Sequence, residues 1–269
     1  MQITRTEVPT GGPNRTPQEH IVSLNTGPRE VEPELIGPDF SESETWPWKS
    51  DPSKNTWDIQ IEAVRQFIVP FEGLDSQAAD EQAGGSDEKG GVYAYPFNNN
   101  FLPVGDGDDD GDLNSANFDR KMAAFLKKYG DNGRPQGGTE IMQSVNASDK
   151  HFLGTKKEPG EFYDTPRDER PVRARVVFTD GALNDVAKFI AYLKQATLSK
   201  DGYGAHGEWD EVWAVAIIGE EGGGGHAAYE QYQEIAKDHP WVHPYYFEGV
   251  VNPAEIAEDM AVAVVPTQA

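Results

Sequence analysis

The chain of 269 residues contains no cysteine. It therefore cannot form a disulfide scaffold, a thiolate-bound zinc site or a cysteine nucleophile. Its histidines also lack the spacing typical of metal ligands. We therefore expect any metal ion that this chain binds to be held by oxygen atoms.

Basic residues are also scarce. The sequence has 23 Lys and Arg against 46 Asp and Glu, which gives a formal net charge of −23. Nucleic-acid binding depends on cations that neutralise phosphates, so no nucleic-acid partner is expected. An anionic membrane surface would repel the chain for the same reason. The charge favours solubility, cations and basic partner surfaces, although a halophilic origin would explain it equally well.

The sequence has no apolar run near the roughly 20 residues that a membrane-spanning helix needs. Its first residues, Met-Gln-Ile-Thr-Arg-Thr-Glu, lack the apolar stretch of a secretory signal. We therefore expect no signal peptide and no membrane insertion. The protein is expected in the cytoplasm, or in a particle assembled there.

Residues 1–50 are rich in Pro, Gly, Ser and Glu, which is typical of an extended arm or a long loop. A short apolar run at 20–25 is the one candidate strand in this arm, and it could be the first strand of the fold. From residue 51 onward the composition changes, and 51–269 is expected to form one domain.

Helical and strand patterns alternate along that domain. The predicted helices are near 56–71, 118–129, 139–153, 186–193, 229–236 and 253–264, and the predicted strands are 91–97, 174–178, 211–218 and 241–247. Residues 154–171 are polar and are expected to form a surface insertion. Strands that alternate with helices predict an α/β fold, with a doubly wound, mainly parallel, Rossmann-like sheet flanked by helices.

Two polar motifs fall where ligands bind in such sheets, beyond the carboxyl ends of the strands. One is Gly137-Gly138-Thr139, directly before a predicted helix, and the other is Thr179-Asp180-Gly181, at the end of a predicted strand. A hydroxyl and a carboxylate at one sheet edge form an oxygen-rich site suited to Mg²⁺. The alternatives are a helix N-cap for Thr139 and a simple turn residue for Asp180.

With these motifs in this order, residues 51–265 resemble the von Willebrand factor A (vWA) domain family. Its metal-ion-dependent adhesion site (MIDAS) combines Asp-x-Ser-x-Ser after the first strand with a Thr in a Gly-Gly-Thr-like loop and an Asp in Thr-Asp-Gly. Thr139 and Asp180 match the last two positions. The resemblance implies a cation-dependent protein–protein binding module, in which a partner's carboxylate completes the shell of a Mg²⁺ ion.

The first motif of that family matches less well. Asp51-Pro52-Ser53-Lys54-Asn55 reads Asp-x-Ser-x-Asn, so the resemblance implies metal ligation by Asp51, Ser53 and Asn55. However, residues 44–50 make a poor buried strand, and the candidate strand at 20–25 is far upstream. An ordinary turn followed by a helix N-cap is the alternative for Asp51 and Ser53.

A second cation site is predicted in the acidic segment that begins at Asp106. Alternate carboxylates and a glycine at the sixth position resemble a calcium loop of the EF-hand or dockerin kind. The departure is at position 12, where Asn117 replaces the usual bidentate carboxylate. The alternative is a solvated acidic loop. The candidate Ca²⁺ ligands are Asp106, Asp108, Asp110, Asp112 and Asn114.

Three functions are open from these patterns. The first is the cation-dependent binding module. The second is a structural subunit of a larger assembly, for example a viral or phage-like particle, in which the N-terminal arm wraps a neighbour and the metal site is vestigial. The third is metal-assisted hydrolysis, but no residue pair suits a general base and a bound water, so we expect no enzyme. Trp46, Trp48 and Trp57 either cover one end of the sheet or anchor an interface.

Overall fold

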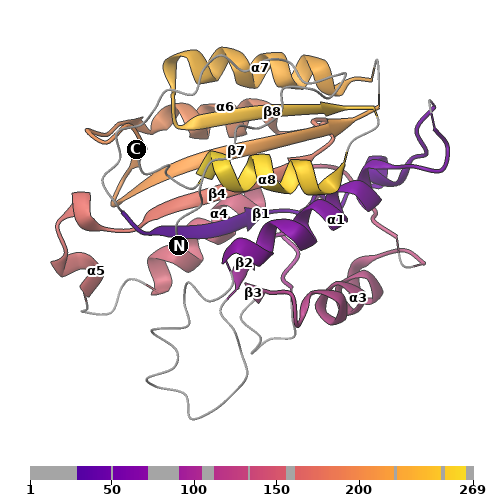
Figure 1. Ribbon diagram of the computed structural model, residues 1–269, viewed down its shortest axis with the longest axis horizontal. Coiled ribbons are helices and arrows are strands. Elements are labelled where there is room, and N and C mark those ends of the chain that lie inside the picture. Colours follow the sequence, from indigo (N-terminus) through magenta and orange to yellow (C-terminus); the bar gives the residue numbers. More distant parts are fainter. Residues whose placement is uncertain are drawn as a thin grey trace, which may run out of the picture.

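The computed structural model describes residues 29–49, 51–71, 91–104, 112–132, 134–155, 161–220, 223–249 and 252–264. Among these residues it forms an α/β fold with one mixed sheet between two layers of helices (Figure 1). Residues 1–28, which include the predicted strand at 20–25, lie outside the described part.

The centre of the sheet is parallel. Strands β2 (Val92–Ala94), β1 (Val31–Ile36), β4 (Val172–Thr179), β7 (Trp209–Gly219) and β8 (Val242–Glu248) lie side by side in this order, each parallel to the next. Both ends of the sheet also carry short antiparallel strands: β3 (Asp112–Leu113) pairs with β2, while β5 (Thr197–Leu198) and β6 (Gly204–His206) form a hairpin on β7. The expected parallel sheet is therefore confirmed for the core only.

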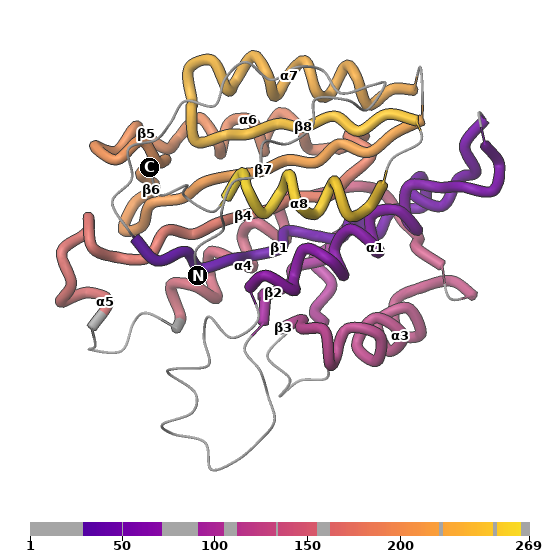
Figure 2. Tube along the Cα trace, in the orientation of Figure 1, coloured from indigo at the N-terminus to yellow at the C-terminus, as the bar shows by residue number. Residues whose placement is uncertain are grey.

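Apolar residues of each helix face one side of the sheet and divide the core in two. Helices α1 (Thr56–Ile68), α3 (Phe118–Tyr129) and α8 (Pro253–Val264) pack in one cluster, and Figures 1 and 2 show α1 and α8 in front of the sheet. Helices α4 (Met142–Thr155), α6 (Val186–Gln195) and α7 (Gly225–Asp238) pack in the other cluster. The long apolar repeats predicted these helices because a buried stripe recurs about every 3.6 residues.

Strand β1 differs from the sequence-based prediction, because it lies inside the segment that was expected to form an N-terminal arm. Its sequence, Val-Glu-Pro-Glu-Leu-Ile, carries two carboxylates and a proline, so it does not have the pattern of a buried strand. In the fold it pairs with β4 along its whole length, from Val31 opposite Val172 to Ile36 opposite Val177. The domain therefore begins well before residue 51.

Buried ion pairs explain how such a polar strand lies next to the centre of the sheet. The Arg173 guanidinium donates to both carboxylate oxygens of Glu34, over 2.9 and 2.8 Å. Arg175 Nε lies 3.2 Å from the same carboxylate. These arginines hold the pKa of Glu34 below its ordinary range against the opposing effect of burial. Without these partners the charge of Glu34 would exclude β1 from the sheet. The arginines of the neighbouring strand β4 compensate that charge, so β1 can be buried there.

Short helices complete the described chain. They are the 3₁₀ helices η1 (Glu42–Thr45), η2 (Val69–Phe71) and η3 (Arg167–Glu169), and the single-turn α5 (Glu161–Asp164) in the predicted surface insertion. Within the described residues, no helix combines the length and the apolar character needed to cross a bilayer.

Candidate metal centre

The candidate site lies where the two central strands β1 and β4 end. They are parallel neighbours, so their carboxyl ends meet at the same edge of the sheet. The connection after β1 leads to α1 on one face, whereas the connection after β4 leads to α6 on the other. In open α/β sheets, such a divergence marks the place where ligands bind.

Three carboxylates converge at this edge of the sheet. Asp39 follows β1, Glu44 lies on η1 in the same loop, and Asp180 directly follows β4. One carboxylate oxygen from each lies within 4.8 Å of the other two. Asp39 and Glu44 are completely buried and Asp180 is half-buried. This spacing suits three oxygen ligands around one cation.

Asp39 is held in place by both strands. Thr179 Oγ1, at the end of β4, donates a 2.8 Å hydrogen bond to Asp39 Oδ2, and the Ser41 amide donates to Oδ1 over 3.1 Å. From α1, Gln60 Nε2 donates to the Asp39 backbone carbonyl over 2.8 Å. These contacts fix the orientation of the carboxylate before any ligand arrives.

Glu44 is held by a backbone amide, and its carboxyl also interacts with that of Asp39. Its Oε1 atom accepts a 2.8 Å hydrogen bond from the Asp180 amide. Its Oε2 atom is buried and has no hydrogen-bond partner within the described part of the chain. A buried carboxylate oxygen without a donor is costly in an empty site, and a cation would satisfy it.

The electrostatics of the cluster favour a positive ligand. Burial raises the pKa of Asp39 to about 7, and the charge of Asp180 adds to the rise. Burial, followed by the charges of Asp39 and Asp180, also holds the pKa of Glu44 well above its ordinary range. In the absence of a cation, the cluster retains protons near neutral pH. A bound divalent cation would displace these protons and stabilise the carboxylates in their ionised form.

Of the residues predicted from sequence, Asp180 belongs to this cluster and Thr139 lies in an adjoining loop. The Gly137 carbonyl accepts a 3.1 Å hydrogen bond from the Glu42 amide, which joins the Gly-Gly-Thr loop to the loop after β1. Thr139 is buried, and its carbonyl accepts from the Asn184 amide over 2.8 Å. The Gly-Gly-Thr loop and Asp180 are thus brought to one edge of the sheet.

Asp51, Ser53 and Asn55 have other roles. Asp51 Oδ1 accepts from the amide and the hydroxyl of Ser53, over 3.1 and 2.6 Å, and its other oxygen lies 3.5 Å from Lys54 Nζ. The Asn55 side chain accepts from the Asp58 amide and caps α1. These contacts form the turn and the N-cap that were the alternative to metal ligation, and Asp51 is not among the three carboxylates of the cluster.

The sequence did contain a signal for the residues that were missed. Asp39-Phe40-Ser41-Glu42-Ser43 reads Asp-x-Ser-x-Ser, the pattern that the vWA resemblance requires after the first strand. The two serine hydroxyls of this motif lie 3.1 Å apart. The sequence alone does not place this motif after a strand, because β1 lacks the apolar pattern of a buried strand. No such pattern indicates Glu44.

The predicted calcium loop is described only at its end. Asp106, Asp108 and Asp110 lie outside the described residues. Asp112 Oδ1 lies 2.8 Å from Lys121 Nζ, and the Asn114 side chain accepts from the amides of Ala116 and Asn117. The Ca²⁺ site therefore stays a prediction.

Two of the three tryptophans near the start of α1 are buried and one is exposed. Trp48 and Trp57 are buried in the core cluster that includes α1. Trp46, two residues after Glu44, is 62% exposed. Core packing is therefore confirmed for two of the three.

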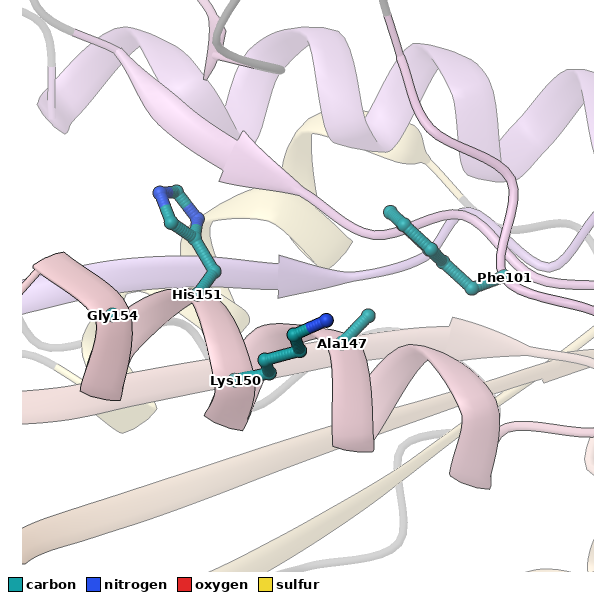
Figure 3. A pocket seen from close by; sticks show the side chains of 5 residues that line it. All are labelled: Phe101, Ala147, Lys150, His151 and Gly154. Atoms are coloured by element: carbon teal, nitrogen blue, oxygen red, sulfur yellow. The ribbon is translucent and has the colours of Figure 1, made fainter.

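A separate shallow hollow of about 500 Å³ opens beside α4. Figure 3 shows the Phe101 ring on one side of it, and Lys150 and His151 of α4 on the other. Its walls are mainly apolar, and no carboxylate lines it. It shares no residue with the carboxylate cluster, which is the better candidate for a functional site.

Comparisons of the chain with protein-family models, with curated proteins and with solved structures found no match.

Proposed function

We propose that this protein is a divalent-cation-dependent protein-binding module of the vWA kind, in which Asp39, Glu44 and Asp180 hold the cation. The observation that carries the proposal is the convergence of three carboxylate oxygens within 4.8 Å at the edge of the sheet. The buried Glu44 Oε2, which has no donor among the described residues, provides independent support, because it points to a missing positive ligand.

The sequence motifs around the cluster support the vWA assignment. Asp39, Ser41 and Ser43 supply the Asp-x-Ser-x-Ser pattern after β1, Thr139 supplies the Gly-Gly-Thr position, and Asp180 supplies Thr-Asp-Gly. The order of the strands, β3-β2-β1-β4-β7 with β8 beyond β7, also agrees with a doubly wound sheet that binds its ligand between β1 and β4.

Carboxylate and hydroxyl oxygens are hard ligands, which favour Mg²⁺ over softer metals. Magnesium retains several waters in such sites, and a carboxylate from a partner protein would complete its coordination shell. The large negative charge of the chain would repel most acidic surfaces. The cation would therefore be the positive contact through which a partner's carboxylate is recognised.

Titration calorimetry with Mg²⁺ or Mn²⁺ tests the cation site directly. We expect one cation to bind to the wild type, and this binding to be lost in Asp39→Asn and in Asp180→Asn. Asp51→Asn is the matched control, because it removes an equal charge from an exposed turn outside the cluster. Equal titrations of wild type and Asp180→Asn would contradict the proposal.

Partner binding is tested in a second step. A protein retained by the immobilised wild type in Mg²⁺ should be released by EDTA and should not bind to Asp180→Asn. Retention that is unchanged by EDTA and by this substitution would contradict the adhesion mechanism.

The alternative function, a structural subunit that wraps its neighbour, depends on an arm whose residues 1–28 lie outside the described part, so it stays a prediction.

A further inference from the structure

Glu44 is an additional carboxylate that the Asp-x-Ser-x-Ser motif does not require. It lies five positions after Asp39 in the same loop, on the short helix η1. Its neighbour Glu42 on this helix is exposed, whereas Glu44 is completely buried and turned into the cluster. The turn thus places one carboxylate in solvent and the other against Asp39 and Asp180.

The burial of the three carboxylates shows which side of the site is accessible. Asp39 and Glu44 are closed off from solvent, and Asp180 is half-buried. The Asp180 amide holds Glu44 Oε1, while Oε2 is buried without a hydrogen-bond partner among the described residues. A cation in this cluster would bind Glu44 without any movement of the backbone.

The net charge of the cation and its three carboxylates limits which further ligand can bind. Three carboxylates outweigh the two positive charges of Mg²⁺ or Mn²⁺, so a fourth carboxylate would approach a site that is already negative. An acidic partner could join the cation at low cost only if one of the three carboxylates withdrew. Glu44 is the one that the sequence motif does not require.

We infer that Glu44 is an internal ligand that keeps the cation site closed, because it takes the coordination position that a partner's carboxylate would occupy. The inference rests on the proposed cation site. In the isolated chain Glu44 binds the cation, and an acidic partner binds by displacing it. The 2.8 Å bond from the Asp180 amide and the 3.1 Å bond from the Glu42 amide to the Gly137 carbonyl hold this closed arrangement.

Mn²⁺ bound to the full-length chain reports on this position, because water-proton relaxation measures the waters that the ion retains. We would compare wild type, Glu44→Gln and Glu44→Ala, with acetate as the carboxylate probe. Glu42→Gln and Glu42→Ala are the matched controls, since they remove the same charge from the exposed side of the same turn. Circular dichroism verifies that each variant is folded, and signal that persists in Asp180→Asn is subtracted as non-specific.

If Glu44 closes the site, its removal lets one more water bind to the Mn²⁺ ion. The relaxivity per bound Mn²⁺ in the Glu44 variants then rises by the contribution of that one water. Acetate should then lower the relaxivity of the Glu44 variants, because it replaces the extra water. If Glu44→Ala has weakened Mn²⁺ binding, acetate should also restore the affinity, because it replaces the lost carboxylate. Acetate should leave wild type and both Glu42 variants unchanged. An equal response to acetate in wild type and in the Glu44 variants would overturn the inference while the cation site stands. Mn²⁺ binding in wild type no tighter than in Asp180→Asn would overturn the proposed function, and this inference with it.

Discussion

The hydroxyl of Thr179 donates a 2.8 Å hydrogen bond to the carboxylate of Asp39, across the boundary between β4 and the loop after β1. These residues are 140 positions apart in the sequence. Because the bond joins two neighbouring parallel strands at the edge where the cation is proposed to bind, the fold itself determines the geometry of the site. The predictions below test this relationship and the packing that supports it.

The contribution of Asp39 to the stability of the metal-free chain should fall as pH rises. The pKa of Asp39 is raised from its ordinary value of 3.8 to about 7, so the folded state retains a proton that the unfolded state has lost. This contribution therefore decreases between these two values and becomes level above them. A shift of this size corresponds to an upper limit on the order of 4 kcal/mol, since one pKa unit is worth about 1.4 kcal/mol.

Denaturant unfolding at several pH values, in EDTA, measures this loss. The stability of wild type relative to Asp39→Asn should fall from pH 4 to 7, because the amide does not titrate, whereas His243, whose pKa burial lowers to about 4, titrates in both chains. Saturating Mg²⁺ should restore stability at neutral pH. A stability difference between wild type and Asp39→Asn that stays constant from pH 4 to 7 would contradict the assigned environment of Asp39.

The buried arginines should be among the most sensitive positions of the fold. Arg173→Ala leaves Glu34 with one fewer partner in a buried cluster, and removal of one member of a buried ion pair typically costs about 3–5 kcal/mol. The double variant Glu34→Gln/Arg173→Met should lose less than Arg173→Ala alone, because no uncompensated carboxylate remains. Urea denaturation measures all of these differences.

Lys237→Ala is the control for that experiment, since Lys237 and Glu234 form an exposed pair on α7. Exposed pairs contribute about 0–1 kcal/mol. A loss in Arg173→Ala as small as that in Lys237→Ala would show that the network does not hold β1 in the sheet.

Gly181 should be essential to the shape of the loop that carries Asp180. Its φ angle is +86°, and a Cβ atom there would lie 2.8 Å from the Ala228 side chain on α7. Gly181→Ala should therefore cost about 1–3 kcal/mol of backbone strain and should also weaken cation binding, because Asp180 would shift. Gly154→Ala is the control, since nothing lies within 4 Å of a Cβ at that position. Calorimetry and thermal unfolding that show no difference between the two variants would contradict this role.

Deletion of residues 1–45 should unfold the domain, because it removes β1 together with Asp39 and Glu44. Deletion of residues 1–28 is the comparison, because it leaves all the described residues in place. Thermal unfolding followed by circular dichroism distinguishes the two. A shortened chain without residues 1–45 that still unfolds cooperatively at the wild-type temperature would show that β1 is dispensable.

The elements that the sequence predicted correctly share one property, a regular apolar pattern. Helix α1 and strand β7 are examples, because burial requires apolar residues at fixed intervals and the interval identifies the element. The strand β1 lacked that pattern. Its Glu34 is buried only because Arg173 and Arg175 reach it from the neighbouring strand, and such a partnership over long sequence distances leaves no local trace.

The sequence alone excluded thiolate ligands for any metal, since no cysteine is present. It also identified the helices, the parallel core, and Asp180 at the end of a strand. Only the tertiary structure decided which carboxylates meet Asp180. Asp39 and Glu44 reach it because β1 and β4 are neighbours, whereas Asp51 lies in an exposed turn. Strand adjacency depends on the packing of the whole sheet, and a local motif does not encode it.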